Sequence, residues 1–330
     1  MWGLVDSKVE ELPLVSIIIV NYNGKTHLEK CLPSVSKSSY AKYEVILVDN
    51  NSIDSSLEFV QKNYPSVSVI KLDNNYGFAE PNNIGAKSAK GELLLFLNND
   101  TITTPDFIAE LVNAAKENPK IAIFQSLLLK PDGTIDSSGD FIDTYGRAYS
   151  SREKTNEIRN IMSARGASMM IRKEVFWDLG GFDKNYFATF EDVDLGLRAW
   201  IWGYKVVLIP KSVVYHLGGQ TIQKLDSLIV FHGVKNTLIL RLTNFDIAFA
   251  MKSIIVLFSV SIMRKLFGIS VIKDAEKSRP LPSFGTIIHG MVWILKNLQY
   301  VLNKRRIIKS RRVVSTKDLV KLGLITKLIK

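Results

Sequence analysis

The sequence predicts an α/β protein with a mostly parallel central sheet flanked by helices, followed by a helical C-terminal extension. Short apolar runs alternate with helical patterns of about ten residues as far as residue 230, which is typical of βαβ units. The run 93–97 (LLLFL) is apolar at every position, as expected for a strand buried on both faces of a parallel sheet. After residue 235 both the charge and the hydrophobic pattern change.

Strands and helices alternate regularly in the first part of the chain. The expected strands, rich in Val, Ile and Leu, are 14–20, 43–48, 67–72, 93–97, 121–128, 167–171 and 205–209. The expected helices lie between them, at 27–36, 55–63, 81–89, 105–117, 173–179 and 193–202. Asn51-Ser52 caps one helix, whereas Gly180-Gly181 and Gly203 end two others. The polar segment 130–160 is expected to be a loop or hairpin excursion.

Length and composition bound the architecture. A chain of 330 residues can form a large α/β domain with an appendage. We predict an α/β domain over 1–235 and a basic, amphipathic helical C-terminal extension over 236–330. The single cysteine, Cys31, excludes a disulfide framework and fits a reducing compartment. Residues 1–13 lack the apolar core of a signal peptide, so we expect the α/β domain in the cytoplasm.

The end of the chain is strongly basic. Residues 235–330 contain 19 Lys and Arg against 4 Asp and Glu, whereas residues 1–234 contain 24 against 28. This asymmetry indicates an anionic partner, either nucleic acid or an anionic membrane surface. No reader motif or aromatic-interleaved basic groove supports nucleic acid.

Two segments of the C-terminal extension favour a membrane surface. Residues 247–263 are apolar apart from Lys252 but are at the short limit for a span, so a true span is the less favoured arrangement. Residues 286–302 combine an apolar stripe with Trp293 and Tyr300, which describes a helix lying in the plane of an anionic bilayer. The stripe is Ile287, Met291, Ile294 or Leu295, Leu298 and Val301, and the basic flank is Lys304, Arg305, Arg306, Lys309, Arg311 and Arg312. The alternative is a helical cap packed on the α/β domain.

The strand at 93–97 is followed directly by Asn98, Asn99 and Asp100. Ligands of open α/β sheets bind beyond the carboxyl ends of the strands. A carboxylate at this position, with amides beside it, can hold a hard divalent cation and through it a diphosphate. The alternative is a polar turn that merely closes a core strand.

Two neighbouring strand ends carry similar polar residues. Asn21, Tyr22 and Asn23 follow the first strand, where the tyrosine offers a ring to a nucleoside base, and Asp49 ends the second. Three such ends at one crevice have the geometry of a nucleotide site. The glycine-rich fingerprints G-x-G-x-x-G and G-x-x-x-x-G-K-[ST] are absent, so a metal at Asp100 is expected to neutralise a bound diphosphate.

Two later motifs carry titratable groups. Glu191, Asp192 and Asp194 lie at the expected start of a helix, where a carboxylate at a pocket mouth can act as general base toward a hydroxyl. Helix capping is the alternative and fits Asp194 best. His216 leaves the last strand near the crevice and is a candidate metal ligand or phosphate contact, although a lone histidine is more often structural.

Six motifs in order resemble family 2 glycosyltransferases of the GT-A fold, with the rhamnosyltransferase-like branch the nearest in appearance. They are VSIIIVNYNG, ILVDNNSIDSS, NNYGFAEPNNIGAKSAKGELLLFLNNDT, RGASMMIRKEVFWDLGGFD, YFATFEDVDLGLRAWIWGY and VVYHLGG, within residues 14–220. The resemblance implies that Asp192 is the catalytic base with Glu191 beside it, and that Asp100 and His216 bind Mg²⁺ or Mn²⁺. The residues implied in binding the nucleotide sugar are Asn21, Tyr22, Asn23, Asp49, Asn51, Asn75, Gly77, Asn83, Asn98 and Asn99.

Two departures from the family pattern narrow the function. The D-x-D motif reads Asn98-Asn99-Asp100, which leaves one carboxylate for the metal, and the Q-x-x-R-W motif of processive synthases is absent. We therefore predict an inverting transferase that moves a single sugar from a nucleotide-diphosphate sugar to a hydroxyl of a glycan or lipid-linked acceptor in cell-surface polysaccharide or glycoconjugate synthesis. It is expected to be peripherally associated with the cytoplasmic face of the membrane. The alternative is an inactive glycosyltransferase-like scaffold.

Overall fold

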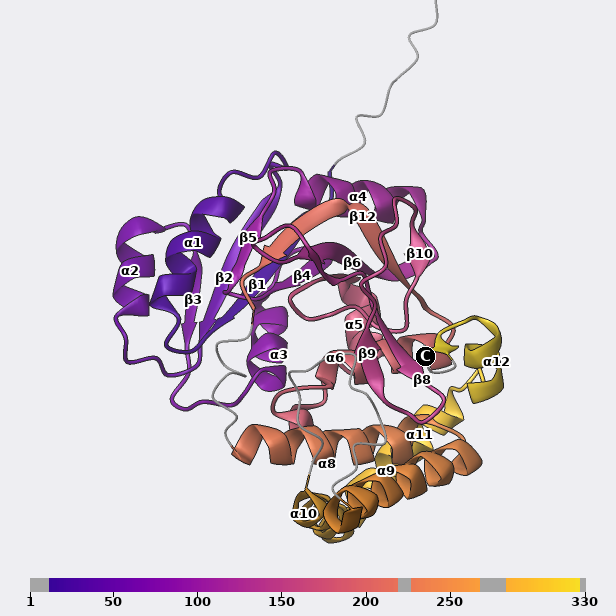
Figure 1. The fold of residues 1–330 in the computed structure, drawn as a ribbon. Coiled ribbons are helices and arrows are strands. Elements are labelled where there is room, and N and C mark those ends of the chain that lie inside the picture. Colours follow the sequence, from indigo (N-terminus) through magenta and orange to yellow (C-terminus); the bar gives the residue numbers. More distant parts are fainter. Residues whose placement is uncertain (1–11, 219–226, 268–282, 327–330) are drawn as a thin grey trace, which may run out of the picture.

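The structure is a computed structural model that describes residues 12–218, 227–267 and 283–326 (Figure 1). Most of the N-terminal segment considered above for a signal peptide lies outside these residues. An α/β domain forms the upper part of the molecule in Figure 1, and a layer of long helices from the end of the chain lies below it. The two parts share buried contacts, which are described below.

The central sheet confirms the predicted mostly parallel α/β fold. Its strand order is β10-β12-β6-β11-β4-β1-β2-β3. The first four strands of the chain pair in parallel, and β12 runs parallel to β6, whereas β11 lies antiparallel between β4 and β6. The strands are β1 (Val15–Asn21), β2 (Tyr43–Asp49), β3 (Ser68–Lys71), β4 (Leu93–Leu97), β6 (Ile121–Leu129), β10 (Arg159–Asn160), β11 (Ser168–Arg172) and β12 (Lys205–His216).

Helices cover both faces of this sheet. They are α1 (Lys25–Val35), α2 (Ser56–Asn63), α3 (Ala79–Ser88), α4 (Phe107–Glu117), α5 (Lys173–Asp178) and α6 (Glu191–Ile201). Alternate residues of β1 face opposite sides: Ile17 packs with α1, α2 and α4, and Ile18 packs with α3, α5 and α6. β4 is buried at every position, which explains its unbroken apolar run.

The segment 130–160 is a hairpin excursion, as predicted. It contains β7 (Ile135–Ser137), β8 (Asp140–Asp143) and β9 (Ala148–Ser150). β8 and β9 form a small second sheet with β13 (Ile325–Thr326), in the order β13-β8-β9. The end of the chain therefore returns to the α/β domain.

The helices of the C-terminal part pack on the α/β domain. They are α8 (Ser227–Asn244), α9 (Ile247–Phe267), α10 (Phe284–Lys296), α11 (Leu298–Ser310) and α12 (Thr316–Lys321). The boundary predicted at 235/236 lies inside α8. A buried cluster joins α8, α9, α10 and α11 to Tyr186 of the α/β domain. None of the helices in the described ranges has the length and apolar character needed to cross a bilayer.

Only part of the apolar stripe predicted for residues 286–302 faces outward, since Leu295 and Leu298 are exposed. The segment forms two helices, α10 and α11, separated at Asn297. Ile287, Ile294 and Val301 are at most 4% exposed because they pack in the cluster with α8. The interpretation as lipid-facing was therefore wrong for these three residues, since each helix uses them to bury apolar area against its neighbours.

The aromatic and basic residues assigned to a membrane also contact protein. The Trp293 ring accepts a cation–π contact from Lys235, and the Tyr300 hydroxyl donates to the Asp183 carboxylate. Lys304 forms ion pairs inside the protein, and Arg311 pairs with Asp178. Arg305 and Arg312 donate to backbone carbonyls at the end of α8. Of the predicted flank, Arg306 and Lys309 are exposed and make no such contact with residues 12–218, 227–267 or 283–326.

Candidate active site

Polar side chains from the ends of β1, β2 and β4 meet at one edge of the sheet. Parallel pairing aligns Asn21 with Asp49. The Asn21 amide donates to the Asp49 carboxylate (3.1 Å), and the Asn99 amide donates to the Asn21 side-chain oxygen (2.9 Å). A Cβ at Gly24 would lie 2.3 Å from the Asn99 amide nitrogen, so this approach requires glycine. The three predicted strand ends therefore form one connected polar region.

Asparagine side chains fold the loops that border this region. Asp49 is fully buried. The Asn50 amide donates to the Asn75 side chain (2.8 Å) and to the Gly77 carbonyl (2.7 Å), which ties the loop after β2 to the next loop. Gly77 has a φ of 82°, and a Cβ there would lie 2.3 Å from the Phe187 carbonyl oxygen. The 75–77 loop is therefore pressed against the segment that leads into α6.

Three predicted ligand-binding residues remain open to solvent. Tyr22 is 50% exposed, and Asn23 and Asn51 are exposed in left-handed backbone conformations with φ of 49° and 66°. Asparagine tolerates this conformation better than most residues. Their side chains are placed where a nucleoside can reach them.

Two other predicted residues lie deeper. Asn83 is 8% exposed, and its amide group donates to the Phe182 carbonyl (2.8 Å) and accepts from the Phe182 N–H (2.9 Å). In this structure it fixes the turn before α6. The side-chain oxygen of Asn98 is buried and has no hydrogen-bond partner within the described residues. Their contact with a nucleotide sugar stays a prediction.

Asp100 and His216 are brought together by β5 (Thr101–Thr103), a short strand that pairs with the end of β12. The His216 Nε2 atom lies 3.4 Å from the Asp100 Oδ1 atom. Its Nδ1 atom lies 2.9 Å from the Asp136 carboxylate of β7, which holds the ring with Nε2 toward Asp100. Arg165 Nη1 in turn lies 3.0 Å from the same Asp136 carboxylate. A chain of four charged groups thus borders the strand ends.

These contacts change the proton affinities of the group. Burial alone would lower the pKa of His216, but its hydrogen bonds to Asp100 and Asp136 outweigh burial and raise the pKa to about 9. Burial opposes ionisation of Asp100, yet the histidine holds the Asp100 pKa below its ordinary value. The carboxylates are therefore stabilised in their ionised form.

The donor set at Asp100 fits a divalent cation. The Asp100 Oδ1 atom is buried, and its contact with His216 Nε2 is long, at 3.4 Å. A carboxylate oxygen is a suitable ligand for Mn²⁺ or Mg²⁺, and so is the imidazole nitrogen of His216 once the cation displaces its proton. No group of three or more His, Cys, Asp or Glu side chains that could hold a metal occurs in residues 12–218, 227–267 or 283–326. Other ligands would have to come from water and the diphosphate.

Glu191 and Asp192 begin helix α6 after a strained approach. Phe187, Thr189 and Phe190 have φ values of 55°, 68° and 67°, in the left-handed region that is costly for side chains of this size. Asp192 is partly buried, and its carboxylate accepts from the Gly166 N–H (3.1 Å). This loop fixes where the two carboxylates of α6 point.

Both carboxyl groups favour the protonated form more than in water. Burial, and then repulsion by Asp140, raise the pKa of Asp192. Burial, and then repulsion by Asp192, raise the pKa of Glu191 well above its ordinary value. Glu191 is 6% exposed and its Oε2 atom has no hydrogen-bond partner among the described residues. Raised carboxyl pKa values beside a cavity are typical of acid–base catalysts.

A cavity of about 120 Å³ opens in front of these carboxyl groups. Its walls come from the β8–β9 hairpin, from Arg165 and from the start of α6. The lining residues are Asp140, Ala148, Tyr149, Ser150, Arg165, Thr189, Phe190, Glu191, Asp192 and Val193. A molecule in this cavity would contact the Asp192 side chain directly.

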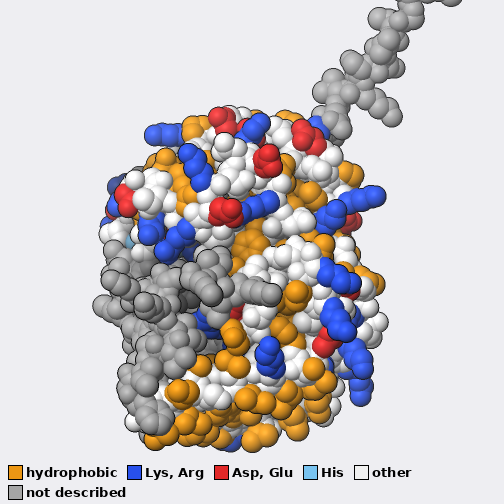
Figure 2. All heavy atoms as spheres, turned by 45° about the vertical axis from the view of Figure 1, so that its right-hand side comes forward, with side chains coloured by type: hydrophobic (Ala, Val, Ile, Leu, Met, Phe, Trp, Pro, Cys, Tyr) orange, Lys and Arg blue, Asp and Glu red, His pale blue; other side chains and the backbone are white. Residues whose placement is uncertain are grey.

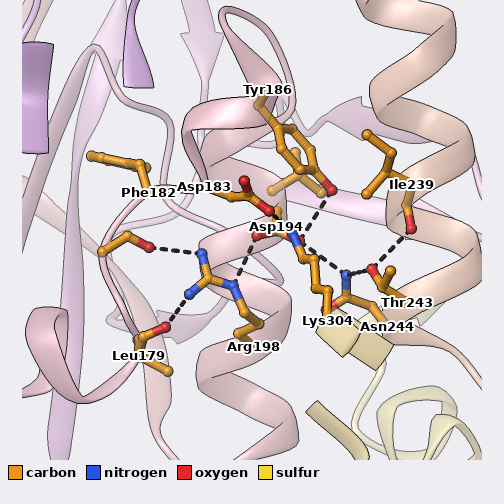
Figure 3. A network of polar contacts seen from close by, with 12 residues as sticks. Leu179, Phe182, Asp183, Tyr186, Asp194, Arg198, Ile239, Thr243, Asn244 and Lys304 are labelled. Atoms are coloured by element: carbon orange, nitrogen blue, oxygen red, sulfur yellow. Dashed lines mark hydrogen bonds and ion pairs between the residues drawn. The ribbon is translucent and has the colours of Figure 1, made fainter. Parts of the chain in front are cut away.

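Asp194, two positions after Asp192, lies in a closed polar network (Figure 3). It accepts from Arg198 Nε (2.8 Å), from the Tyr186 hydroxyl (3.1 Å) and from the Asn244 amide (3.0 Å). Lys304 Nζ of α11 lies 2.9 Å from the same carboxylate. Burial opposes its ionisation, but Lys304 and Arg198 keep the pKa of Asp194 below its ordinary value. Asp194 is therefore an ion-pair centre, and helix capping does not describe its role.

Several residues of the site are not predicted from the sequence. The segment 130–160, for which the sequence predicts only a loop or hairpin, contains Asp136, Asp140 and Tyr149, and Arg165 follows it. No local motif marks these four residues. The alternation of apolar and polar residues around Asp140–Asp143 is the one signal that could have placed a strand there.

Comparison with known proteins assigns the chain to a family. The model of Glycosyl transferase family 2 matches residues 16–180, half of the chain. The O-antigen biosynthesis protein RfbC of Myxococcus xanthus is 32% identical over 224 residues, which are 63% of this chain but 18% of that protein. An N-acetylglucosaminyl-diphospho-decaprenol L-rhamnosyltransferase of Mycobacterium tuberculosis is 25% identical over 232 residues, 62% of this chain and 76% of that protein.

Solved structures share the fold at lower identity. GalNAc-T7 with UDP, GalNAc and Mn²⁺ matches with a TM-score of 0.61 and 19% identity, covering 87% of this chain and 58% of that one. S. aureus TarS 1–349 matches with a TM-score of 0.54 and 17% identity, covering 94% of this chain and 91% of that one. At such identities the likeness concerns the fold alone, which is of the GT-A type.

Proposed function

The chain belongs to glycosyl transferase family 2, and we propose that it is an inverting enzyme that moves a single sugar from a nucleotide-diphosphate sugar to a hydroxyl of a glycan or lipid-linked acceptor in cell-surface polysaccharide or glycoconjugate synthesis. Support for the acceptor class comes from the mycobacterial relative, whose name includes a diphospho-decaprenol-linked sugar. The observation that carries the proposal is the position of Asp192. Its carboxylate lines a cavity of about 120 Å³, and burial raises its pKa.

Asp192 acts as the general base in this reaction. It takes the proton from the acceptor hydroxyl while that oxygen attacks the anomeric carbon of the donor from the side opposite the diphosphate. The new C–O bond forms as the bond to the diphosphate breaks, and the diphosphate departs with the electron pair. The Gly166 N–H holds one oxygen of the Asp192 carboxylate (3.1 Å), which fixes its orientation toward the cavity.

Asp100 and His216 would hold Mg²⁺ or Mn²⁺. The cation would stabilise the negative charge that develops on the departing diphosphate. Tyr22, Asn23 and Asn51 offer exposed polar and aromatic groups to the nucleoside part of the donor. Asp136 orients His216 toward Asp100, so we add it to the residues that serve this half of the site.

We further propose that the C-terminal extension binds an anionic membrane surface at the cytoplasmic face, where a lipid-linked acceptor is presented. Figure 2 shows hydrophobic side chains gathered at the bottom of the molecule, where Figure 1 places α9 and α10. The net positive charge of residues 235–330 complements anionic lipid. The exposed apolar side chains are Ile247, Met251, Ile255, Ile262, Met263 and Leu266 of α9 and Ile288, Val292, Leu295, Leu298 and Leu302 of α10 and α11.

An inactive scaffold is the alternative from another class. Two features weigh against it: the Asp100–His216 pair and the open cavity at Asp192 are both intact. A scaffold would have no need for the buried Glu191 Oε2 atom, which has no hydrogen-bond partner among the described residues, because such a group destabilises the fold.

A donor screen tests the enzymatic proposal. The purified chain is incubated with Mn²⁺, a panel of nucleotide sugars and acceptor glycosides, and nucleotide diphosphate release is measured. We expect release with one donor class and a fall in kcat of about 10²- to 10⁴-fold for Asp192→Asn, with nucleotide affinity preserved. Lys309→Gln, at an exposed position of α11, is the control. Normal turnover by Asp192→Asn would refute the base assignment.

Calorimetric titration tests the metal half. Asp100→Ala should weaken binding of the nucleoside diphosphate in the presence of Mn²⁺ and leave binding without metal nearly unchanged. Asp132→Ala, which removes an exposed carboxylate of a turn, is the matched control. Equal metal-dependent affinity in Asp100→Ala would exclude Asp100 as a ligand.

The membrane proposal requires surface substitutions and not truncation. Deleting residues 240–330 would remove Asn244 and Lys304, which neutralise and satisfy buried Asp194, so loss of binding could reflect unfolding. Ile255→Ser with Val292→Ser and Leu295→Ser should lower sedimentation with anionic vesicles at an unchanged melting temperature. Ile53→Ser, an exposed apolar residue on the α/β domain, should not. Unchanged vesicle binding by the triple variant would contradict the proposal.

A further inference from the structure

Helix α8, the first helix of the C-terminal extension, holds the segment of chain that leads into α6. Figure 1 shows α8 passing below α6, and the two helices are in contact. Side chains of α8 contact the segment 185–190, which ends directly before Glu191 and Asp192. Asn236 makes the largest share of these contacts, as the distances below show. Whatever fixes this segment also fixes where the two carboxyl groups of α6 lie.

The backbone of the segment needs support from other elements. Phe187 (φ 55°, ψ −68°) lies at the centre of a γ-turn, in which the Ala188 N–H donates to the Tyr186 carbonyl (2.6 Å). This form of the γ-turn is rare and strained. Thr189 and Phe190 follow in the left-handed region. Such conformations are costly and persist only where the surrounding structure holds them.

Asn236 supplies three hydrogen bonds to this backbone. Its amide nitrogen lies 2.7 Å from the Tyr186 carbonyl oxygen, 2.9 Å from that of Ala188 and 2.7 Å from that of Thr189. The side chain is fully buried, and its oxygen has no partner among the described residues. An amide turned the other way would press that oxygen against three carbonyls, so the nitrogen must face the segment. The position therefore serves as a donor to the strained turn.

Two neighbours of Asn236 on α8 hold the same segment. Lys235 is 2% exposed, and its ammonium donates to the Asn185 carbonyl. The His232 ring stacks on the Phe187 ring, with centroids 4.8 Å apart and an interplanar angle of 19°. Both contacts lie at the start of the segment, and Asn236 extends the hold to its end.

The donor side of the site is held by other bonds. The Phe187 carbonyl accepts from the N–H groups of Phe78 and Ala79, so the segment 185–190 also contacts the start of α3. The loop before α3 is tied to the loop after β2 by the Asn50 amide. Release of the segment from α8 would therefore displace the start of α6 and leave the nucleotide-binding loops in place.

We propose that Asn236 is a positioning residue of the transferase, which holds the segment 185–190 in the conformation that presents the Asp192 carboxylate to the reacting hydroxyl. The inference rests on the proposed function and adds to the active site a residue of the C-terminal extension. Asn236 acts through the backbone of the segment and not by contact with the reacting groups. Without its hydrogen bonds the segment would relax toward less strained conformations, and a displacement of about 1 Å at the base can cost about 10²-fold in rate.

Turnover at saturating substrate tests the proposal, with the donor and acceptor found in the screen. Asn236→Leu keeps the approximate shape of the side chain but cannot donate. We expect kcat to fall by about 10- to 100-fold, while the affinity for the nucleoside diphosphate stays within about threefold. Asn236→Ala leaves room for water to reach the carbonyls, which favours folding, and should lower kcat by about tenfold.

A control on the same helix separates positioning from a general loss of stability. Leu238→Ala removes apolar packing between α8 and Gly290 of α10 and should lower the melting temperature while retaining most of kcat. A fall in kcat for Leu238→Ala as large as that for Asn236→Leu would overturn the inference.

A double-variant cycle shows whether Asn236 acts through the base. If it does, Asn236→Leu should lower kcat by less than about threefold in the Asp192→Asn background. A purely structural role would reduce kcat by the same factor in both backgrounds. Equal factors, or an unchanged kcat in both Asn236 variants, overturn the positioning role alone. Absence of nucleotide diphosphate release by the wild-type chain with every donor would instead overturn the proposed function.

Discussion

The two sides of helix α6 differ in how their polar groups are satisfied. Asp192 and Asp194 lie two positions apart, so their side chains point to opposite sides of the helix. Asp192 faces a cavity, where burial and Asp140 raise its pKa. Asp194 faces a closed network in which Lys304 and Arg198 lower its pKa. On the cavity side the Glu191 Oε2 atom has no hydrogen-bond partner among the described residues, whereas on the other side the network holds the helix in place.

The closed network depends on a residue from far along the chain. Lys304 Nζ lies 2.6 Å from Asp183 and 2.9 Å from Asp194, and the ammonium also lies over the Tyr186 ring (4.5 Å). Figure 3 shows Asn244 joining the same carboxylate from α8. The helices below the sheet are thus held to the base-bearing helix by charge as well as by apolar packing.

The largest effect is expected from breaking this network. Lys304→Met removes the ammonium that pairs with Asp183 and one of the two cations that pair with buried Asp194, so the free energy of unfolding should fall by about 3–5 kcal/mol. Urea unfolding measures the change. Lys309→Met, an exposed lysine on the same helix, should stay within about 0.5 kcal/mol of wild type. Similar stabilities for both variants would show that the network is not the main attachment.

Replacing Asp194 or Asp192 by asparagine should change the free energy of unfolding in opposite directions at neutral pH. The folded-state pKa of Asp194 is lowered, so its charge stabilises the fold above the unfolded pKa and this contribution is lost as pH falls through the folded pKa. Asp194→Asn should therefore cost about 1–3 kcal/mol at pH 7 and less in acid. The measurement is the melting temperature from about pH 2 to about pH 8, because the contribution of Asp194 is lost only below the ordinary aspartate pKa.

For Asp192 the expected change in the free energy of unfolding has the opposite sign. Its folded-state pKa is raised, so its favourable contribution is present below the unfolded pKa and is lost as pH rises through the folded pKa. Asp192→Asn should stabilise the protein by about 0.5–2 kcal/mol at pH 7, as substitutions at catalytic groups often do. Loss of stability in both variants would mean that the two sides of α6 do not differ as described.

A smaller effect concerns the pH dependence of turnover. The base must be ionised, so kcat/KM should fall as pH decreases through the raised pKa of Asp192. Asp140→Asn removes the repulsion that helps to raise this pKa and should move the acidic limb of the profile to lower pH. An unmoved limb would exclude Asp140 as a determinant.

The sequence predicted the sheet better than the helices below it. Strands such as 93–97 are apolar at every position, and this pattern has one structural solution, burial in a parallel sheet. The stripe at Ile287, Ile294 and Val301 has two structural solutions, since a bilayer and a neighbouring helix bury apolar side chains equally well. The packing of this stripe against α8, a helix that the sequence pattern does not predict, decides between the two solutions.

The candidate site was predictable in the same uneven way. Asn21, Asp49, Asp100 and Asp192 follow strands or open a helix, so chain position alone marks them. Asp136 acts through a contact with His216 that lies 80 residues away in the sequence. Long-range pairings of this kind leave no local pattern to find.

The smallest effect separates surface charge from both sides of α6. Arg311 stacks on Trp202 (3.8 Å) and pairs with Asp178, and both members of this ion pair are substantially exposed, at 43% and 38%. Arg311→Ala should therefore cost only about 0.2–1 kcal/mol, because water and salt screen an exposed pair. Vesicle binding should be affected less than by Arg306→Ala with Lys309→Ala, since those two side chains are exposed and have no partner of this kind in the described part of the chain. A loss from Arg311→Ala as large as that from Lys304→Met would show that burial does not set the strength of these ion pairs.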